Sequence, residues 1–498
     1  MPPKSIAGMI KAKAEKKIKE KEIEKQIQNT DDNLDDDDLE REFQKMLDSL
    51  TPKATPSIST NDSSRIKYKI PEEIKFNPIK MTSEEYGPYG TQWVHDEQTD
   101  DILGDDEIRR SNQLDALMSI VYPEQRSEAW FKMRNDKITA SDGGTVVGIN
   151  KHEPQYKFIL KKVVGAPFQS NEFCYHGKKY EKIATMVYEN RMNVKVEEFG
   201  LVGHPTIDHL GASPDGIIGK YKLDGKHLTK FVGRMLEIKC PLVRKIKMDG
   251  DIKDNICPIY YWAQVQLQLQ CCLLDECDFW QCELIEYRNR QDFINDTNPD
   301  EPFRSLTNGN EKGCLIQLIP MDRVKDVKDG KYLEVIYDTA SFIYPPSIEM
   351  SPHDLDQWVL ETIQNLSSNP LYKDYVLDKV IYWRIGTNKS VTIYRDDKWF
   401  DENKPILEKH WKQVEYFRNN QEKTKILTDF IDSLLVKSNT KIMNIIDDIM
   451  NNPIDSRVIK NILKSTADNK IKKEESIKRK ADKESLALYM YDDILAKV

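Results

Sequence analysis

The spacing of hydrophobic residues predicts a long helix in the second quarter of the chain. After His176-Gly177, apolar side chains recur at intervals of three and four residues, at Tyr180, Ile183, Ala184, Val187 and Tyr188. This spacing places them on one stripe of a helix, which would pack against a sheet. The apolar residues of 126–134 have a similar helical spacing, so a shorter helix is expected there.

Strand patterns follow the long helix. Residues 194–210 alternate between apolar and polar positions and contain two glycines and a proline, so we expect two short strands there. The run between Gly233 and Pro241 is apolar except for two charged residues, which predicts a buried strand. Residues 279–287 resemble a further core strand, with aromatic side chains at its start.

Two patterns compete between Tyr260 and Leu274. Glutamines alternate with apolar residues over 264–270, which favours a strand. The stretch is also long enough for a helix, and a helix would bring Tyr261, Gln264 and Gln268 to one side. The residues alone leave both possibilities open.

The last quarter of the chain predicts a hairpin followed by helices. Residues 379–385 and 390–395 have strand patterns and are separated by Gly386–Lys389, which predicts a two-stranded hairpin. A helix rich in aromatic residues is expected from Trp399 to Val414. Residues 290–376 give no clear pattern.

Composition divides the chain into three parts. Residues 1–50 are low in complexity and include an acidic block, a pattern typical of disordered arms, and 51–80 are rich in Ser, Thr, Pro and Lys, as in linkers. We therefore expect a charged, disordered arm and linker over 1–80, a folded domain over 81–420 and a helical, Lys-rich tail over 421–498.

Charge and length exclude several classes of protein. The net charge of −9 over 498 residues excludes a uniformly basic DNA coat protein, so nucleic-acid binding would depend on local patches. No apolar run is long enough to span a bilayer, and the first residues lack a signal-peptide pattern. We therefore expect an intracellular protein. A nucleotide-binding Gly-x-x-x-x-Gly-Lys-[Ser/Thr] motif is absent, which excludes a motor of its own.

Three charged residues form a candidate catalytic cluster. Asp215 lies in a Pro-Asp-Gly turn. Glu237 and Lys239 are two residues apart on the expected strand, so their side chains leave from the same face. Carboxylates are oxygen ligands for Mg²⁺ or Mn²⁺, and a neighbouring lysine can stabilise charge on a phosphoryl group. The alternative is a surface turn beside a half-exposed strand, but charges that interrupt an apolar strand favour the paired or metal-bound arrangement.

The motifs around this cluster resemble a known superfamily. Pro-Asp at 214–215 followed by Glu-Ile-Lys at 237–239 resembles the signature of the PD-(D/E)XK nucleases. The longer stretches 211–216 and 237–241 resemble the lambda-exonuclease branch, the YqaJ-like viral recombinases, including members found in large DNA viruses. The resemblance covers about 120–420. It implies an α/β fold, with a restriction-endonuclease-like core, a mixed central sheet flanked by helices and a helical C-terminal tail.

The resemblance also implies a metal centre. One Mg²⁺ or Mn²⁺ ion would be held by Asp215, Glu237 and the carbonyl of Ile238, and a second by Asp215 and Glu181. Glu181 matches a helical glutamate of the family within Gly-x-x-x-Glu, although on pattern alone it could be a surface residue. Lys239 would position the attacking water.

Four further residues acquire expected roles from the same resemblance. A Tyr-x-x-Gln motif on a helix near the active site matches Tyr261 and Gln264, which favours the helix over the strand there. An Arg and a Ser that hold a terminal 5′-phosphate match Arg134 and Ser141. The residues alone suggest Ser141 as the N-cap of a helix, with Asp142 in its first turn.

The eight cysteines do not match a standard metal motif. Four of them, Cys271, Cys272, Cys277 and Cys282, lie close together, and some nucleases of the superfamily carry an iron–sulfur cluster. Their spacing fits buried thiols in a helix and the following strand better.

The expected function is therefore metal-dependent exonuclease action on DNA. By resemblance, the enzyme would degrade duplex ends 5′→3′ during recombination, repair or replication, beside a single-strand annealing protein and as a homo-oligomer. The cytoplasm, a viral replication site and the nucleus are equally compatible with this. Two alternatives remain: a structure-specific endonuclease of the same fold, and a non-catalytic DNA-end-binding protein.

Overall fold

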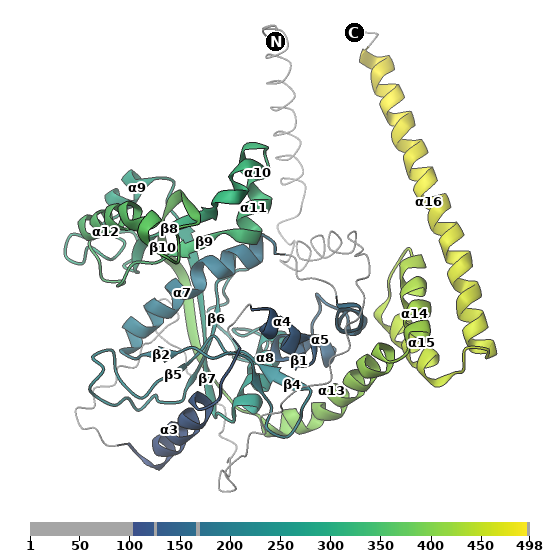
Figure 1. The fold of residues 1–498 in the computed structure, drawn as a ribbon, viewed down its shortest axis with the longest axis horizontal. Coiled ribbons are helices and arrows are strands. Elements are labelled where there is room, and N and C mark those ends of the chain that lie inside the picture. The colour runs from purple at the N-terminus through teal and green to yellow at the C-terminus, as the bar shows by residue number, and fades with distance from the viewer. Residues whose placement is uncertain (1–102, 124–126, 166–169, 496–498) are drawn as a thin grey trace. The chain divides into compact units, whose positions relative to one another are not determined.

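The computed structural model describes residues 103–123, 127–165 and 170–495, with side chains to 479 (Figure 1). All of them belong to one compact unit, Ser57–Val498. The arm and linker expected over 1–80 lie outside the described residues.

A seven-stranded mixed sheet forms the centre of this unit. Its strands, in spatial order, are β2 (Val196–Glu197), β5 (Gly216–Ile218), β6 (Met235–Lys239), β7 (Glu276–Glu286), β10 (Tyr375–Tyr394), β8 (Lys312–Pro320) and β9 (Ser341–Ile343). Strands β6 and β7 run parallel, and every other neighbouring pair is antiparallel. A smaller sheet contains β1 (Ile138–Thr139), β4 (Leu210–Ala212) and β3 (Val202–Gly203).

Helices cover both faces of the main sheet. One face packs on α7 (Glu172–Met192), α10 (Val324–Lys328) and α11 (Tyr332–Thr339). The other packs on α3 (Asp105–Met118) and α8 (Ile259–Cys272) at one end, and on α9 (Arg290–Asn295) and α12 (Pro352–Asn365) at the other. The expected fold class, a mixed central sheet flanked by helices, is thereby confirmed.

Most of the remaining helices form a separate hydrophobic cluster with strands β1 and β4 of the small sheet. They are η1 (Ala140–Asp142), α5 (Gly143–Val146), α6 (Gln155–Leu160), η2 (Lys161–Gly165), α13 (Asp397–Arg418), α14 (Gln421–Ser433), α15 (Asn439–Asn451) and α16 (Arg457–Leu495). Helices α4 (Glu128–Asn135), η3 (Met321–Arg323) and η4 (Leu366–Ser368) lie outside this cluster.

The predicted C-terminal tail is helical, as expected. Its buried isoleucines, from Ile426 to Ile462, share one cluster with Phe158 and Trp411, so these helices pack on the preceding domain. Among the described helices, none is both long and apolar enough to cross a bilayer.

Two sequence predictions of local structure are wrong. Residues 379–395 do not form a hairpin: they belong to the single strand β10, which pairs with β7 on one side and β8 on the other. The turn-like segment Gly386–Lys389 contains a β-bulge, since Ile385 pairs with Leu284 but Asn388 pairs with Cys282. The long helix begins at Glu172 with Asn171 as N-cap, several residues before His176.

The ambiguous stretch at 260–274 is helical, and residues 194–210 form only very short strands. Cys271 and Cys272 lie in α8, and Cys277 and Cys282 lie in β7, where all four are buried. Their expected placement in a helix and the following strand is confirmed.

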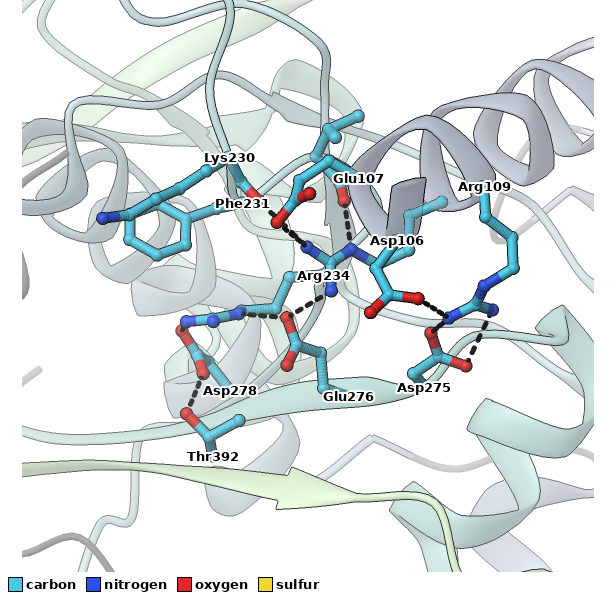
Figure 2. Close-up of polar contacts among 12 residues, drawn as sticks. Asp106, Glu107, Arg109, Lys230, Phe231, Arg234, Asp275, Glu276, Asp278 and Thr392 are labelled. Atoms are coloured by element: carbon cyan, nitrogen blue, oxygen red, sulfur yellow. Dashed lines mark hydrogen bonds and ion pairs between the residues drawn. The ribbon is translucent and has the colours of Figure 1, made fainter. Parts of the chain in front are cut away.

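A buried ionic network anchors α3 to the amino ends of β6 and β7. Figure 2 shows Arg234 between Glu276 and Asp278, with Nε–Oε1 and Nη1–Oδ2 distances of 2.9 and 3.4 Å. Thr392 donates a 2.7 Å hydrogen bond to Asp278, and Arg109 pairs with Asp275. Burial raises the pKa of Glu276, but the neighbouring arginines outweigh it and hold the pKa below its ordinary value. The network thus fixes the strand ends opposite the end that carries Lys239.

We predict that Arg234→Leu destabilises the protein by about 3–5 kcal/mol, because two buried carboxylates lose a cation, although Glu276 keeps Arg110 at 3.5 Å. Denaturant unfolding would measure this change. Arg290→Leu is the matched control, because its pair with Asp356 is largely exposed and is worth at most about 1 kcal/mol. Equal effects of the two substitutions would show that the network is not important for stability.

The loss of stability caused by Arg234→Leu should depend on pH. A carboxylate with a lowered pKa contributes stability above its unfolded pKa and loses it as the pH falls towards the folded pKa. For Glu276 the contribution is complete above the ordinary value of 4.5 and declines below it. The difference between wild type and Arg234→Leu should therefore shrink in acid, and a difference that grows would contradict the assignment.

Candidate active site

Glu237 is the buried centre of the candidate site. Met235–Lys239 pair in parallel register with Cys277–Gln281, so β6 is an interior strand. The alternation of the strand turns Ile238 towards α7 and turns Glu237 and Lys239 towards α8. Glu237 is 0% exposed, so its charge must be compensated locally.

Three donors surround the Glu237 carboxylate. Oε1 accepts hydrogen bonds from Lys239 Nζ at 2.5 Å and from Gln264 Nε2 at 2.7 Å. Oε2 accepts one from Gln268 Nε2 at 2.6 Å. Gln264 and Gln268 are one turn apart on α8, so a single helix face supplies both amides. Three of the expected site residues, Glu237, Lys239 and Gln264, are thus in direct contact.

Asp215 lies beside the carboxyl end of the same strand. It directly precedes β5, whose pairing with β6 stops at Gly216 and Leu236. Beyond that point Asp215 Oδ2 accepts a 2.7 Å hydrogen bond from the backbone N–H of Ile238. Within a strand, the N–H and C=O of one residue point to the same side. The Ile238 carbonyl therefore faces the side on which Asp215 lies.

The carboxylates at this strand end repel one another. Burial raises the pKa of Asp215 well above its ordinary value, and the charges of Glu237 and Glu181 raise it further. Lys239 and the Ile238 amide act in the opposite direction without offsetting this. Glu181, half-buried on α7, is thus electrostatically coupled to Asp215 although α7 covers the opposite face of the sheet.

Lys239 remains a cation in this setting. Burial lowers its pKa, but Glu237, Tyr261 and Asp215 outweigh burial, so the pKa lies above the ordinary value. Its Nζ lies 4.4 Å from the centre of the Tyr261 ring. Tyr261 therefore lies beside the cluster, one turn from Gln264 on α8.

The donor set fits a divalent cation. Among the residues that the structure describes, no three His, Cys, Asp and Glu side chains are gathered into a preassembled metal site. The carboxylates of Asp215 and Glu237 and the Ile238 carbonyl are nevertheless hard oxygen donors of the kind Mg²⁺ binds. Gln268 Oε1 is buried and has no hydrogen-bond partner, so the polar shell is incomplete. An added cation would relieve the repulsion that raises the pKa of Asp215.

Arg134 and Ser141 lie together in a second polar cluster. Arg134 Nη2 donates a 3.2 Å hydrogen bond to Ser141 Oγ, and the guanidinium lies 4.5 Å from the Trp130 ring centre. Burial lowers the pKa of Arg134. The expectation that Ser141 is an N-cap is wrong, because Thr139 occupies the N-cap and forms a capping box with Asp142. Ser141 is the second residue of η1, and its side chain is exposed.

Two lysines complete this second cluster. Asp142, 4% exposed, pairs with Lys161 and Lys162 at 3.0 Å each. Burial raises the pKa of Asp142, but the two ammonium groups outweigh it and hold that pKa far below its ordinary value. Three cations, including Arg134, thus surround one carboxylate. The cluster carries two excess positive charges, which is the charge that a phosphate monoester dianion would neutralise.

Helix α8 connects the two clusters. The segment after Asp142 packs closely on α8, where a Cβ at Gly144 would lie 2.9 Å from the Tyr260 Cα. Only glycine allows this approach, because the Tyr260 Cα belongs to the main chain and cannot rotate away. The same helix therefore holds the cluster of Asp215, Glu237 and Lys239 and the cationic cluster around Asp142.

Several residues of the site have little or no signal in the sequence. The sequence places Gln268 on one helix side with Tyr261 and Gln264, but no motif gives Gln268 a role. In the helix, Gln264 and Gln268 bind Glu237, whereas Gln266 and Gln270 bind Tyr394 and Asp397. Lys161 and Lys162 follow an apolar run, and only tertiary folding brings them to Asp142.

Comparisons with known proteins identify the region that holds both clusters. Residues 129–273 match the family model of the YqaJ-like viral recombinase domain. An uncharacterized protein of Acanthamoeba polyphaga mimivirus is 37% identical over 342 residues, which is 68% of this chain and 61% of that protein. A protein of African swine fever virus is 26% identical over 170 residues, 29% of this chain and 45% of that protein. The chain thus spans less than two thirds of either relative.

A crystal structure of an alkaline exonuclease from Laribacter hongkongensis aligns with 60% of this chain and 98% of its own, at 18% identity and a TM-score of 0.32. Both clusters described above lie within the segment that matches the family model, and the match to the mimivirus protein is longer than that segment. The family likeness of this chain is therefore to the YqaJ-like viral recombinase domain, over residues 129–273.

Proposed function

We propose that this protein is a metal-dependent DNA exonuclease that degrades duplex ends 5′→3′ in recombination, repair or replication. The observation that carries the proposal is the buried Glu237, held by Lys239 and two glutamines beside Asp215. A buried, polar and negatively charged strand end of this kind has little value for stability alone. It suits phosphodiester hydrolysis, which requires charge neutralisation around the reacting phosphate.

Asp215, Glu237 and the Ile238 carbonyl would hold one Mg²⁺ or Mn²⁺ ion, and Asp215 and Glu181 would hold a second. Bound cations of this kind activate water and stabilise charge on the attacking and leaving oxygens. Lys239, positively charged and held against Glu237, would orient the attacking water. Gln264 and Gln268 keep the carboxylate of Glu237 in place, and Tyr261 would contact the substrate beside Lys239.

The cationic cluster would bind the 5′-phosphate of the DNA end. A terminal phosphate carries more negative charge than an internal phosphodiester, and the cluster has three cations around the single carboxylate of Asp142, with Glu153 also near Lys161. Ser141 is exposed and already accepts a hydrogen bond from Arg134, so both can face one ligand. Partner proteins follow from the family expectation alone: a single-strand annealing protein and a second copy of this chain remain predictions.

We predict that Asp215→Ala, Glu237→Ala and Lys239→Ala each reduce cleavage of linear duplex DNA on the order of 10²-fold or more, because each removes a charge at the reacting phosphate. Rates are measured with purified, folded variants in Mg²⁺. Near-normal turnover of any one variant would sink the assignment. A covalently closed circular duplex separates the alternatives, since an exonuclease leaves it intact and a structure-specific endonuclease does not.

Glu181→Gln should lower activity steeply, with little recovery at high Mg²⁺, because it removes charge that acts on Asp215 while keeping the side-chain shape. Glu172→Gln, on an exposed position of the same helix, is the matched control and should leave the kinetics unchanged. Wild-type kinetics in Glu181→Gln would make Glu181 an ordinary helix-surface residue.

Duplexes with 5′-phosphates should be degraded faster than those with 5′-hydroxyls. Arg134→Ala and Lys161→Ala should each reduce that preference about 10- to 100-fold, as expected for loss of a charge-assisted hydrogen bond. Lys132→Ala, on the exposed face of α4, serves as control. The measurement is a rate ratio on matched duplexes. A wild-type ratio of one would refute the end-sensing role and favour the endonuclease.

A further inference from the structure

A cavity of about 290 Å³ lies further along β7 from the candidate active site and has no role in the proposed reaction. Its walls come from four segments that are far apart in the sequence: the loop after β6, the end of β7, the loop before β8, and β10. The lining residues are Met248, Glu283, Ile285, Asn308, Arg384 and Thr387, with Gly386.

Strand register places this cavity on the catalytic face of the sheet. Lys239 pairs with Gln281 across β6 and β7, and paired residues share a face. Glu283 and Ile285 follow Gln281 at two-residue steps, so they lie on that face about 7 and 13 Å further along β7. This part of the sheet face lies between the part on which α8 packs and the part on which α9 and α12 pack. The cavity occupies the gap between them.

The bulge in β10 keeps the cavity open. Thr387 N donates a 3.0 Å hydrogen bond to Glu283 Oε2, which fixes the carboxylate at the wall. A Cβ at Gly386 would lie 2.6 Å from Glu283 Oε2 and 2.7 Å from Ile285 Cδ1. Any side chain at 386 would therefore collide with this wall. The bulge places Gly386 and Thr387 against the carboxylate of Glu283, and bulges often adjoin functional sites.

Two opposite charges line the cavity without pairing. In the described part of the chain, no ion pair within 4 Å joins Arg384 to Glu283. Arg384 Nε lies 3.9 Å from Asp296 Oδ2, which is too long for a hydrogen bond. That carboxylate already accepts from Tyr287 and Ser305 at 2.5 and 2.6 Å. The guanidinium donors of Arg384, whose side chain is 21% exposed, are therefore available to a ligand.

The chemistry of the walls selects the kind of ligand. Met248 and Ile285 offer apolar surfaces, Arg384 offers donors, and Glu283 offers an acceptor edge. A phosphate group would be repelled by Glu283. A flat heteroaromatic ring with both donors and acceptors on its edge satisfies all four residues, since arginine and carboxylate side chains read such edges in nucleic acids.

We propose that this cavity is a nucleobase subsite that receives one unstacked base of the bound DNA strand near the candidate catalytic centre. The inference rests on the proposed function, which brings DNA to this face. Its location along β7 from Lys239 suits a base close to, but not at, the phosphate held by the Asp215 cluster. A captured base would hold the strand end apart from its complement, which a nuclease acting on a duplex end requires.

Fluorescence of 2-aminopurine tests the subsite without cleavage. Duplexes carry this base at successive positions from the 5′ end, and binding is measured in EDTA with full-length protein. Wild type should brighten the probe several-fold at one position, where the base leaves the stack. Arg384→Met and Ile285→Trp should abolish that change, because one removes the donors and the other fills the cavity. DNA binding by anisotropy should persist in both.

A second cavity provides the matched control. It has about 350 Å³, lies between α12 and β9, and is lined by Thr362 among others. Thr362→Trp should leave the signal at the sensitive position intact. Thermal melts verify folding, and Arg384→Met remains informative if Ile285→Trp does not fold.

The outcomes separate the subsite from the nuclease proposal. A probe that brightens at no position, or at the same position in both variants, overturns the subsite, even if wild type degrades DNA normally in Mg²⁺. A position-specific signal that both variants lose supports it, even if the wild-type protein proves unable to cleave DNA.

Discussion

The burial of one negative charge organises the functional half of this structure. Glu237 lies on an interior strand with no solvent access, so its carboxylate requires donors from the protein. Lys239, two residues along the same strand, supplies one. Gln264 and Gln268 supply the others and thereby fix the position of α8 over the sheet. Helix α8 thus compensates the charge of Glu237, and the same hydrogen bonds fix the position of the helix.

Because α8 is fixed in this way, it can carry a second set of contacts. The glycine segment after Asp142 packs against α8 at main-chain distance. That contact positions the cationic cluster of Arg134, Lys161 and Lys162 relative to the carboxylates. The negatively charged end of β6 and the cationic cluster both pack on α8, and a DNA end could bridge them. At the other end of the parallel strands, the Arg234 network fixes the frame on which both depend.

The proximity of Asp215, Glu237 and Lys239 could be predicted from the sequence because short-range rules control it. Glu237 and Lys239 share a face by strand periodicity, and Asp215 lies in a turn that its Pro and Gly neighbours specify. The same rules failed where two local structures suit the same residues. Gly386–Lys389 is compatible with a turn or a bulge, and only pairing with both β7 and β8 selects the bulge. Ser141 and Thr139 are both acceptable caps, and the capping box with Asp142 selects Thr139. The pairing of Asp142 with Lys161 and Lys162, and the cavity beside Arg384, depend on tertiary contacts that no local pattern encodes.

Binding of Mn²⁺ measures the central claim most directly, namely that mutually repelling carboxylates around Glu237 form a cation site. Titration calorimetry on the full chain, without DNA, would compare wild type with Asp215→Asn and Glu237→Gln. Each variant keeps the side-chain shape and removes one negative charge. We expect saturable binding by wild type that both substitutions abolish or greatly weaken. Equal Mn²⁺ binding by all three proteins, or none by wild type even after addition of uncleaved duplex DNA, would contradict the assignment of this cluster as a metal centre.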